Sequence, residues 1–143
     1  MIGSVDGYRR ILDFKNGTAD TGLYVLGGKL SFYSVAEAPS SSVAVNTFVQ
    51  VVLTRDAAKK VIGYVNGVKQ LEFTDSSDLG LIDNNNTLRF FKDNNFEASA
   101  GSVARIRLYN GPLSASEVAA LDRLPSGTGA SECLAPPSGM VGW

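Results

Sequence analysis

The stretch that decides the fold runs from Lys60 to Phe73 and reads KVIGYVNGVKQLEF. Two short runs rich in β-branched and aromatic residues flank Asn66-Gly67 at its centre. Asn-Gly is the preferred turn of a two-residue hairpin, because both positions must adopt positive φ angles and both residues tolerate them. We therefore expect two antiparallel strands, Lys60–Val65 and Val68–Phe73, joined by a type I′ turn.

The segments around this hairpin show the same short, glycine-punctuated pattern. Gly27-Gly28 separates two runs and predicts a second tight hairpin. Thr47–Arg55 is apolar on both faces, which predicts a central position in its sheet. Ser102–Tyr109 alternates, which is typical of a strand in an antiparallel sheet with one face in water. Four further runs also read as strands: Tyr8–Phe14, Gly22–Leu26, Lys29–Tyr33 and Leu88–Phe91. All these segments together predict an all-β chain.

One short helix is expected near the C-terminus. Ser114 and Glu117 form a capping box, and Val118, Leu121 and Leu124 share one helical stripe before Pro125 ends it. The residues that follow are rich in Gly, Ser and Pro and have no periodicity. We therefore expect one domain over residues 8–124 and a tail or linker over residues 125–143.

Composition excludes several classes of function. The 143 residues are 44% hydrophobic and carry a net charge of -1, so the chain should bury a core and has no electrostatic footprint for nucleic acid. The apolar runs are far shorter than the roughly 20 residues that span a membrane, so membrane insertion is not expected. The chain has no histidine, which excludes a Ser-His-Asp triad and every His-liganded zinc site. No signal peptide is visible.

Three segments, in this order, resemble a known superfamily. They are LTRD (Leu53–Asp56), YVNG (Tyr64–Gly67) and IRLYNGPLSASEV (Ile106–Val118). They are similar to laminin G-like modules of the concanavalin A-like lectin/glucanase superfamily, and closest to its bacterial extracellular members. The resemblance implies a jelly-roll sandwich of two antiparallel sheets. It also implies an extracellular or cell-surface location.

This sequence departs from the family pattern on the N-terminal side of the first expected strand. Complete modules of this kind carry further strands before the segment that matches Tyr8–Phe14, and here only seven residues precede it. A sandwich without those strands should expose a sheet edge, which can pair with another chain.

Glycoside hydrolysis needs two carboxylates about 5–10 Å apart across the sugar. The nearest pair in sequence is Glu72 and Asp75, and their odd offset places them on opposite faces of a strand. We therefore expect no enzyme activity and no catalytic residue.

Two kinds of binding site are expected from the resemblance and the residue types. Ca²⁺ takes oxygen ligands, and the turn that contains Asp93, Asn95 and Glu97 supplies several, although such residues are also ordinary turn formers. Glycan binding would use aromatic rings and planar polar groups on a wet sheet face. The expected glycan-binding residues are Tyr33, Tyr64, Arg105, Arg107 and Tyr109, with an ordinary solvated face as the alternative.

The tail suggests a role in assembly. Cys133 has no partner for an internal disulfide, so it is either an exposed thiol or a crosslink to a second chain. Met140 and Trp143 lie near the end of the tail, where a large aromatic side chain gains from burial. The tail should therefore pack on its own domain or add to the open edge of a neighbouring copy.

These observations favour a non-catalytic extracellular module for recognition or cell adhesion, whose partner is a glycan or an extracellular protein. The alternatives are a structural subunit of a homo-oligomeric or filamentous assembly and a degenerate, glucanase-like fragment. The only cofactor that the sequence suggests is Ca²⁺.

Overall fold

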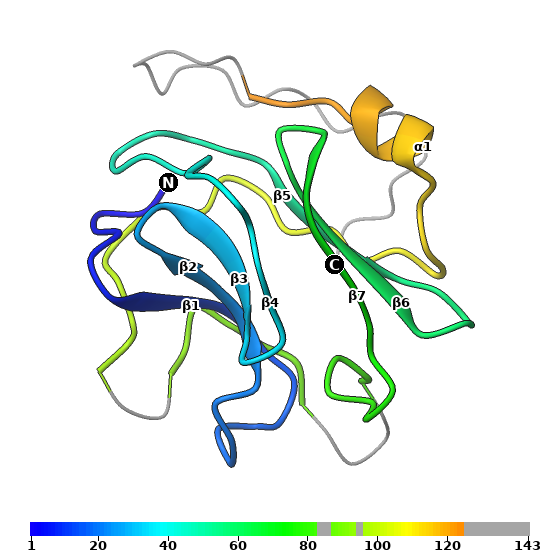
Figure 1. The fold of residues 1–143 in the computed structure, drawn as a ribbon. Coiled ribbons are helices and arrows are strands. Elements are labelled where there is room, and N and C mark those ends of the chain that lie inside the picture. Colours follow the sequence, from blue (N-terminus) through cyan, green and yellow to red (C-terminus); the bar gives the residue numbers. More distant parts are fainter. Residues whose placement is uncertain (83–86, 94–95, 125–143) are drawn as a thin grey trace.

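The computed structural model describes residues 1–82, 87–93 and 96–124, which form two antiparallel sheets and one short helix (Figure 1). The larger sheet has the strand order β4-β3-β2-β1-β8, and the smaller has the order β5-β6-β7. The predicted all-β fold with a short C-terminal helix is therefore confirmed. In chain order the strands are β1 (Tyr8–Asp13), β2 (Gly22–Leu26), β3 (Lys29–Tyr33), β4 (Ala36–Glu37), β5 (Val51–Arg55), β6 (Lys60–Val65), β7 (Val68–Thr74) and β8 (Arg89–Phe90).

Both predicted hairpins form. Asn66 and Gly67 have φ angles of 50° and 80° at the turn between β6 and β7, as a type I′ turn requires. Gly27 and Gly28 have φ angles of 56° and 80° between β2 and β3. Because these turns depend on two adjacent residues, local sequence was sufficient to predict them.

The core lies between the two sheets. β2 and β3 contribute Leu23, Val25, Leu30 and Phe32, all of which are almost fully buried. The ring of Phe32 lies 4.8 Å from that of Phe73 on β7, so this contact joins the two sheets. The core also includes Phe14, Ala38, Val43, Val65 and Leu71.

The close approach of the sheets depends on Gly63 in β6. A Cβ atom at this position would lie 2.8 Å from Leu30 Cδ2, which is closer than side chains normally pack. The absence of a side chain at Gly63 therefore lets Leu30 reach across to the second sheet.

The strand register places a second group of residues on the outer face of the larger sheet. Leu23 pairs with Phe32, and these residues face the core. The positions that alternate with them, Tyr24 and Tyr33, therefore face outward, as does Arg10, which pairs with Tyr24. This outer face carries the candidate site described below.

The predicted strand Ser102–Tyr109 is wrong for the described part of the chain. Gly101 bridges to Ile2, and the backbone N–H of Ser102 donates to Met1 O at 3.0 Å. Beyond Ser102, residues 103–109 make no backbone hydrogen bond to any described residue. The alternating sequence favours a strand, but a strand also needs a neighbour that supplies its ladder of hydrogen bonds.

The expected central position of Thr47–Arg55 is also wrong. Only Val51–Arg55 is a strand, and it is at the edge of the smaller sheet. Val51 and Leu53 pack against the core, and Phe48 and Val52 line the same cavity as these two residues, so apolar residues on both faces do not require a central position.

Helix α1 (Ala115–Ala120) begins with the predicted capping box. Ser114 N donates to Glu117 Oε2 at 2.8 Å, and Glu117 N donates to Ser114 Oγ at 3.3 Å. Val118 is fully buried. The helix lies beside the β6–β7 turn, since a Cβ on Gly67 would be 3.3 Å from Ala119 Cα (Figure 1).

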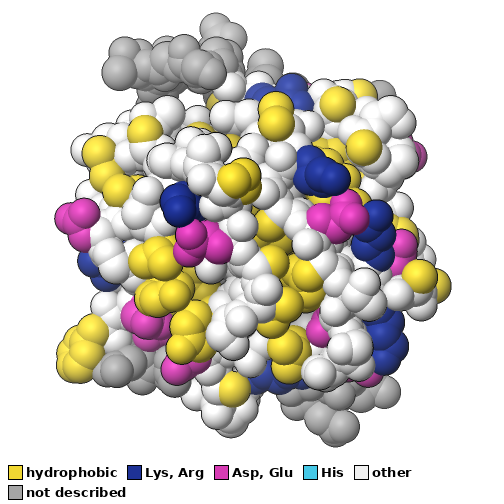
Figure 2. All heavy atoms as spheres, viewed as in Figure 1, with side chains coloured by type: hydrophobic (Ala, Val, Ile, Leu, Met, Phe, Trp, Pro, Cys, Tyr) yellow, Lys and Arg dark blue, Asp and Glu magenta, His cyan; other side chains and the backbone are white. Residues whose placement is uncertain are grey.

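The surface agrees with the balanced charge of the sequence. Figure 2 shows acidic and basic side chains interspersed over one face, without a large area of a single sign. Among the described residues, no helix is long and apolar enough to cross a membrane.

Candidate functional site

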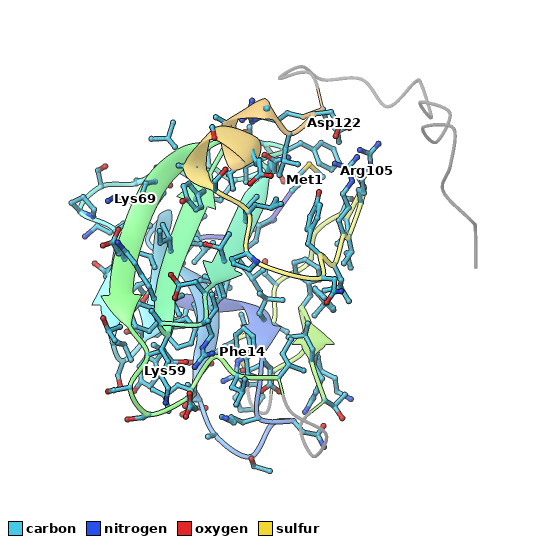
Figure 3. The ribbon with its side chains drawn as sticks, turned by 90° about the vertical axis from the view of Figure 1, so that its right-hand side faces the viewer. Met1, Phe14, Lys59, Lys69, Arg105 and Asp122 are labelled. Atoms are coloured by element: carbon cyan, nitrogen blue, oxygen red, sulfur yellow. The ribbon has the colours of Figure 1, made fainter. Side chains whose placement is uncertain are left out.

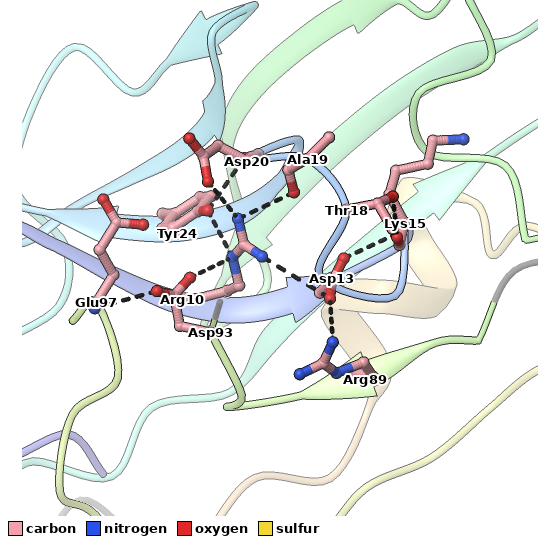
Figure 4. Close-up of polar contacts among 10 residues, drawn as sticks. All are labelled: Arg10, Asp13, Lys15, Thr18, Ala19, Asp20, Tyr24, Arg89, Asp93 and Glu97. Atoms are coloured by element: carbon pink, nitrogen blue, oxygen red, sulfur yellow. Dashed lines mark hydrogen bonds and ion pairs between the residues drawn. The ribbon is translucent and has the colours of Figure 1, made fainter. Parts of the chain in front are cut away.

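The outer face of the larger sheet is organised around the buried side chain of Arg10 on β1 (Figure 4). Its Nε donates to the hydroxyl of Tyr24 and lies 3.0 Å from Asp93 Oδ1. Its two terminal nitrogens lie 3.5 Å from Asp20 Oδ1 and 3.8 Å from Asp13 Oδ2. One guanidinium therefore joins β1, β2 and two loops.

Asp13 extends this arginine cluster toward β8. Its side chain is fully buried, with Oδ2 lying 3.5 Å from Arg89 Nη1 and Oδ1 accepting a hydrogen bond from Lys15 N at 2.8 Å. Charges at this depth are tolerated only when they are paired and hydrogen-bonded. Removing one partner would therefore leave another buried charge uncompensated.

Three tyrosines form a patch beside this cluster. The ring centroid of Tyr8 lies 5.5 Å from that of Tyr24 and 5.2 Å from that of Tyr33, and both pairs are T-shaped. Tyr24 is fully buried, whereas 37% of Tyr33 is exposed and Tyr8 is half-buried. This tyrosine patch thus presents two fixed rings to solvent, with Tyr24 as their buried support.

The carboxyl groups next to the patch differ in their surroundings. The side chain of Asp20 is 57% exposed, and its backbone carbonyl accepts a hydrogen bond from the Tyr24 hydroxyl at 3.0 Å. Burial, together with the charges of Asp93 and Asp20, raises the pKa of Glu97 above its ordinary value. Burial also raises the pKa of Tyr24 above its ordinary value. The patch is therefore bordered by acceptors of hydrogen bonds.

The structure separates the five predicted ligand-binding residues. Tyr33 belongs to the tyrosine patch. Tyr64 lies on β6, where it is only 3% exposed and does not present its ring to solvent. These two tyrosines lie on different sheets. The structure therefore does not bring Tyr33 and Tyr64 together in one site.

Arg105, Arg107 and Tyr109 lie together elsewhere. Arg105 Nη1 pairs with Asp122 Oδ2, and Arg107 Nη1 lies 2.6 Å from Asp122 Oδ1. Arg107 and Arg105 hold the pKa of Asp122 well below its usual range. Figure 3 shows Arg105 and Asp122 near Met1, at the opposite end of the molecule from Lys59. These arginines are already engaged with the segment that follows α1.

The predicted calcium residues lie at the arginine cluster. Asp93 Oδ2 accepts a hydrogen bond from Glu97 N at 3.2 Å, and Asp93 Oδ1 faces Arg10. Asn95 lies outside the described residues. Among the residues that are described, no three His, Cys, Asp or Glu side chains gather as a metal site. Calcium at this turn would compete with a guanidinium for Asp93, and it stays a prediction.

Cys133, Met140 and Trp143, the predicted assembly residues, also lie outside the described part of the chain. The predicted role of Cys133 stays a prediction, and Met140 and Trp143 are considered below together with the groove that the described residues form.

Sequence reasoning missed Tyr8, Arg10 and Asp20 as members of one site. The available signal was the alternation of Tyr8 and Arg10 with the core-facing residues of the first strand. It could not be used without the register that pairs Arg10 with Tyr24.

The chain was compared with known proteins. A family model for laminin G-type domains, described as the concanavalin A-like lectin/glucanases superfamily, matches residues 1–119. The chain belongs to this family. Comparisons of this laminin G-type domain with curated proteins and with solved structures gave no significant match. The predicted family is therefore confirmed, and it indicates a carbohydrate- or protein-binding module.

The raised pKa of Glu97 predicts a pH-dependent stability. The folded domain binds this proton more tightly than the unfolded chain does, so ionisation of Glu97 lowers stability at neutral pH, and this cost disappears as pH falls below the ordinary value of 4.5. Glu97→Gln should therefore raise the melting temperature at pH 7 and have little effect well below pH 4.5. Glu37→Gln, which alters a surface carboxylate 2.9 Å from Lys29 Nζ, is the control. A lower melting temperature for Glu97→Gln at pH 7 would contradict the assignment.

The calcium hypothesis makes a separate prediction. If Asp93, Asn95 and Glu97 share an ion, millimolar Ca²⁺ should raise the melting temperature relative to chelator, by about 2.7 kcal/mol of stability at a hundredfold excess over Kd. Asn95→Ala should remove that gain. Identical melting curves in chelator and in Ca²⁺ would rule out the site.

Proposed function

We propose that this laminin G-type domain is a non-catalytic extracellular recognition module that binds a glycan at the tyrosine patch. The observation that carries the proposal is the pair of partly exposed rings, Tyr8 and Tyr33, whose centroids lie 5.2 Å apart and which pack against Tyr24, whose hydroxyl donates to the backbone carbonyl of Asp20. The family supports the broader statement that the domain binds carbohydrate or protein.

The chemistry of the patch suits a sugar. Tyrosine rings offer an apolar face to the C–H groups of a pyranose, and their hydroxyls can exchange hydrogen bonds with it. Carboxyl oxygens, such as those of Asp20 and Glu97, accept hydrogen bonds from sugar hydroxyls. Because Arg10 and Tyr24 hold the surrounding loops and rings in place, little side-chain entropy would be lost on binding.

Two carboxylates considered for hydrolysis have other partners. Glu72 lies 2.8 Å from Lys60 Nζ and 3.1 Å from Lys69 Nζ, and these lysines lower the pKa of Glu72. A general acid needs a raised pKa instead. Asp75 is buried and accepts hydrogen bonds from the backbone N–H groups of Leu79 at 2.7 Å and of Gly80 at 3.0 Å. These contacts support a structural role for both residues.

A glycan array followed by titration calorimetry on a positive ligand tests the proposal. Tyr33→Ala should weaken binding about tenfold, the loss of roughly 1.4 kcal/mol expected for an aromatic anchor. Tyr109→Ala is the matched control, because Tyr109 is similarly exposed but lies on a different part of the chain. Its affinity should equal that of the wild type.

The reverse result, loss of binding in Tyr109→Ala alone, would move the site to the Arg105–Tyr109 segment. An array without any ligand, combined with capture of an extracellular protein that Tyr33→Ala abolishes, would keep the patch but replace the glycan with a protein. Release of reducing sugar from a β-glucan would overturn the non-catalytic assignment.

A further inference from the structure

A large apolar groove lies apart from the tyrosine patch and is not used by the proposed function. It has a volume of about 610 Å³ and opens between the free edge of β5, the core side of β1 and β2, and residues 102–109. Its lining includes Leu12, Leu23, Val25, Val51, Leu53 and Ile106. Apolar side chains that line a water-filled groove lack the favourable packing contacts that another apolar group would give them.

The two sides of the groove have the properties of strands that lack a neighbour. β5 pairs with β6 on one side, and within the described residues no strand pairs with its other edge. Across the groove, residues 103–109 make no backbone hydrogen bond to a described residue, and Val103, Ile106 and Leu108 are 52%, 49% and 75% exposed. Natural proteins cover such edges, because an uncovered edge pairs with other chains.

We propose that this groove accepts one added β-strand and that the strand is the C-terminal segment of the same chain, Gly139–Trp143. An added strand could pair with the free edge of β5 on one side and with residues 103–109 on the other. Its side chains would alternate between the groove and the opposite face of the sheet.

The position of the described C-terminus favours this occupant. Leu121–Leu124 line the groove, so the remaining chain leaves the domain at its rim. The 14 residues between Leu124 and Gly139 span roughly 46–50 Å when extended, whereas five residues of β5 are about 17 Å long. Pro136-Pro137 cannot donate ladder hydrogen bonds, which restricts the strand to the residues after them.

Tethering favours the same chain over a second copy. A short flexible linker gives its attached segment an effective concentration in the millimolar range, far above the concentration of free protein in most experiments. The segment also contains Met140, Val141 and Trp143, which have apolar side chains of the kind that the groove buries. The proposal is independent of glycan binding, since the groove and the tyrosine patch use different residues.

Trp143 is the only tryptophan in the chain, so its fluorescence reports on this segment alone. In the full chain we expect emission at a shorter wavelength than free tryptophan and severalfold weaker quenching by acrylamide, both independent of protein concentration. Ile106→Asp, in the groove, should return both properties to those of a solvated tryptophan. Val68→Asp is the matched control, because Val68 is 62% exposed on the far strand of the smaller sheet.

A second variant tests the proposal without altering the described domain, so its result does not depend on whether Ile106→Asp folds. Val141→Asp changes only the added segment, so it should expose Trp143 while the far-ultraviolet circular dichroism stays the same. Solvent-like emission in the wild type would overturn the proposal, and so would shielding that neither variant relieves. Shielding that grows with protein concentration would assign the strand to a second copy and overturn docking within one chain.

Discussion

The outer face of this domain depends on one buried guanidinium. Arg10 lies at the junction of β1, β2 and the loops that carry Asp20 and Asp93, and its guanidinium contacts Asp13, Tyr24, Asp20 and Asp93. A buried charge that loses a partner strongly destabilises the folded state. The carboxyl groups that contact Arg10 are therefore held close to its guanidinium. The tyrosine patch rests on this arrangement, because its buried member, Tyr24, is hydrogen-bonded to Arg10.

The two sheets have different surroundings. The larger sheet buries one face in the core and uses the other for the patch, while the smaller sheet packs across Gly63 and Phe73. The smaller sheet ends at β5, whose free edge borders the groove. The proposed glycan site uses Tyr8, Tyr24 and Tyr33, and none of these residues lines the groove proposed for strand addition.

The predictions that succeeded depend on neighbouring residues, and those that failed depend on distant ones. The Asn66-Gly67 turn and the Ser114 capping box each follow from a few adjacent residues. Ser102–Tyr109 has a strand-like sequence, but its conformation is decided by whether a distant partner is present. The predicted ligand-binding set was divided for the same reason, since exposure of Tyr33 and burial of Tyr64 depend on which elements cover each sheet. Sequence alone also could not reveal that Asp93 faces Arg10 rather than only other loop oxygens.

The central claim is that Arg10 holds the site together, and urea unfolding of Arg10→Met tests it most directly. Leaving Asp13 and Asp93 without this partner should lower the free energy of unfolding by about 3–5 kcal/mol. Arg105→Met, which removes a solvent-exposed ion pair with Asp122, should cause a much smaller change. Equal losses in the two variants, or an Arg10→Met domain as stable as the wild type, would contradict the account.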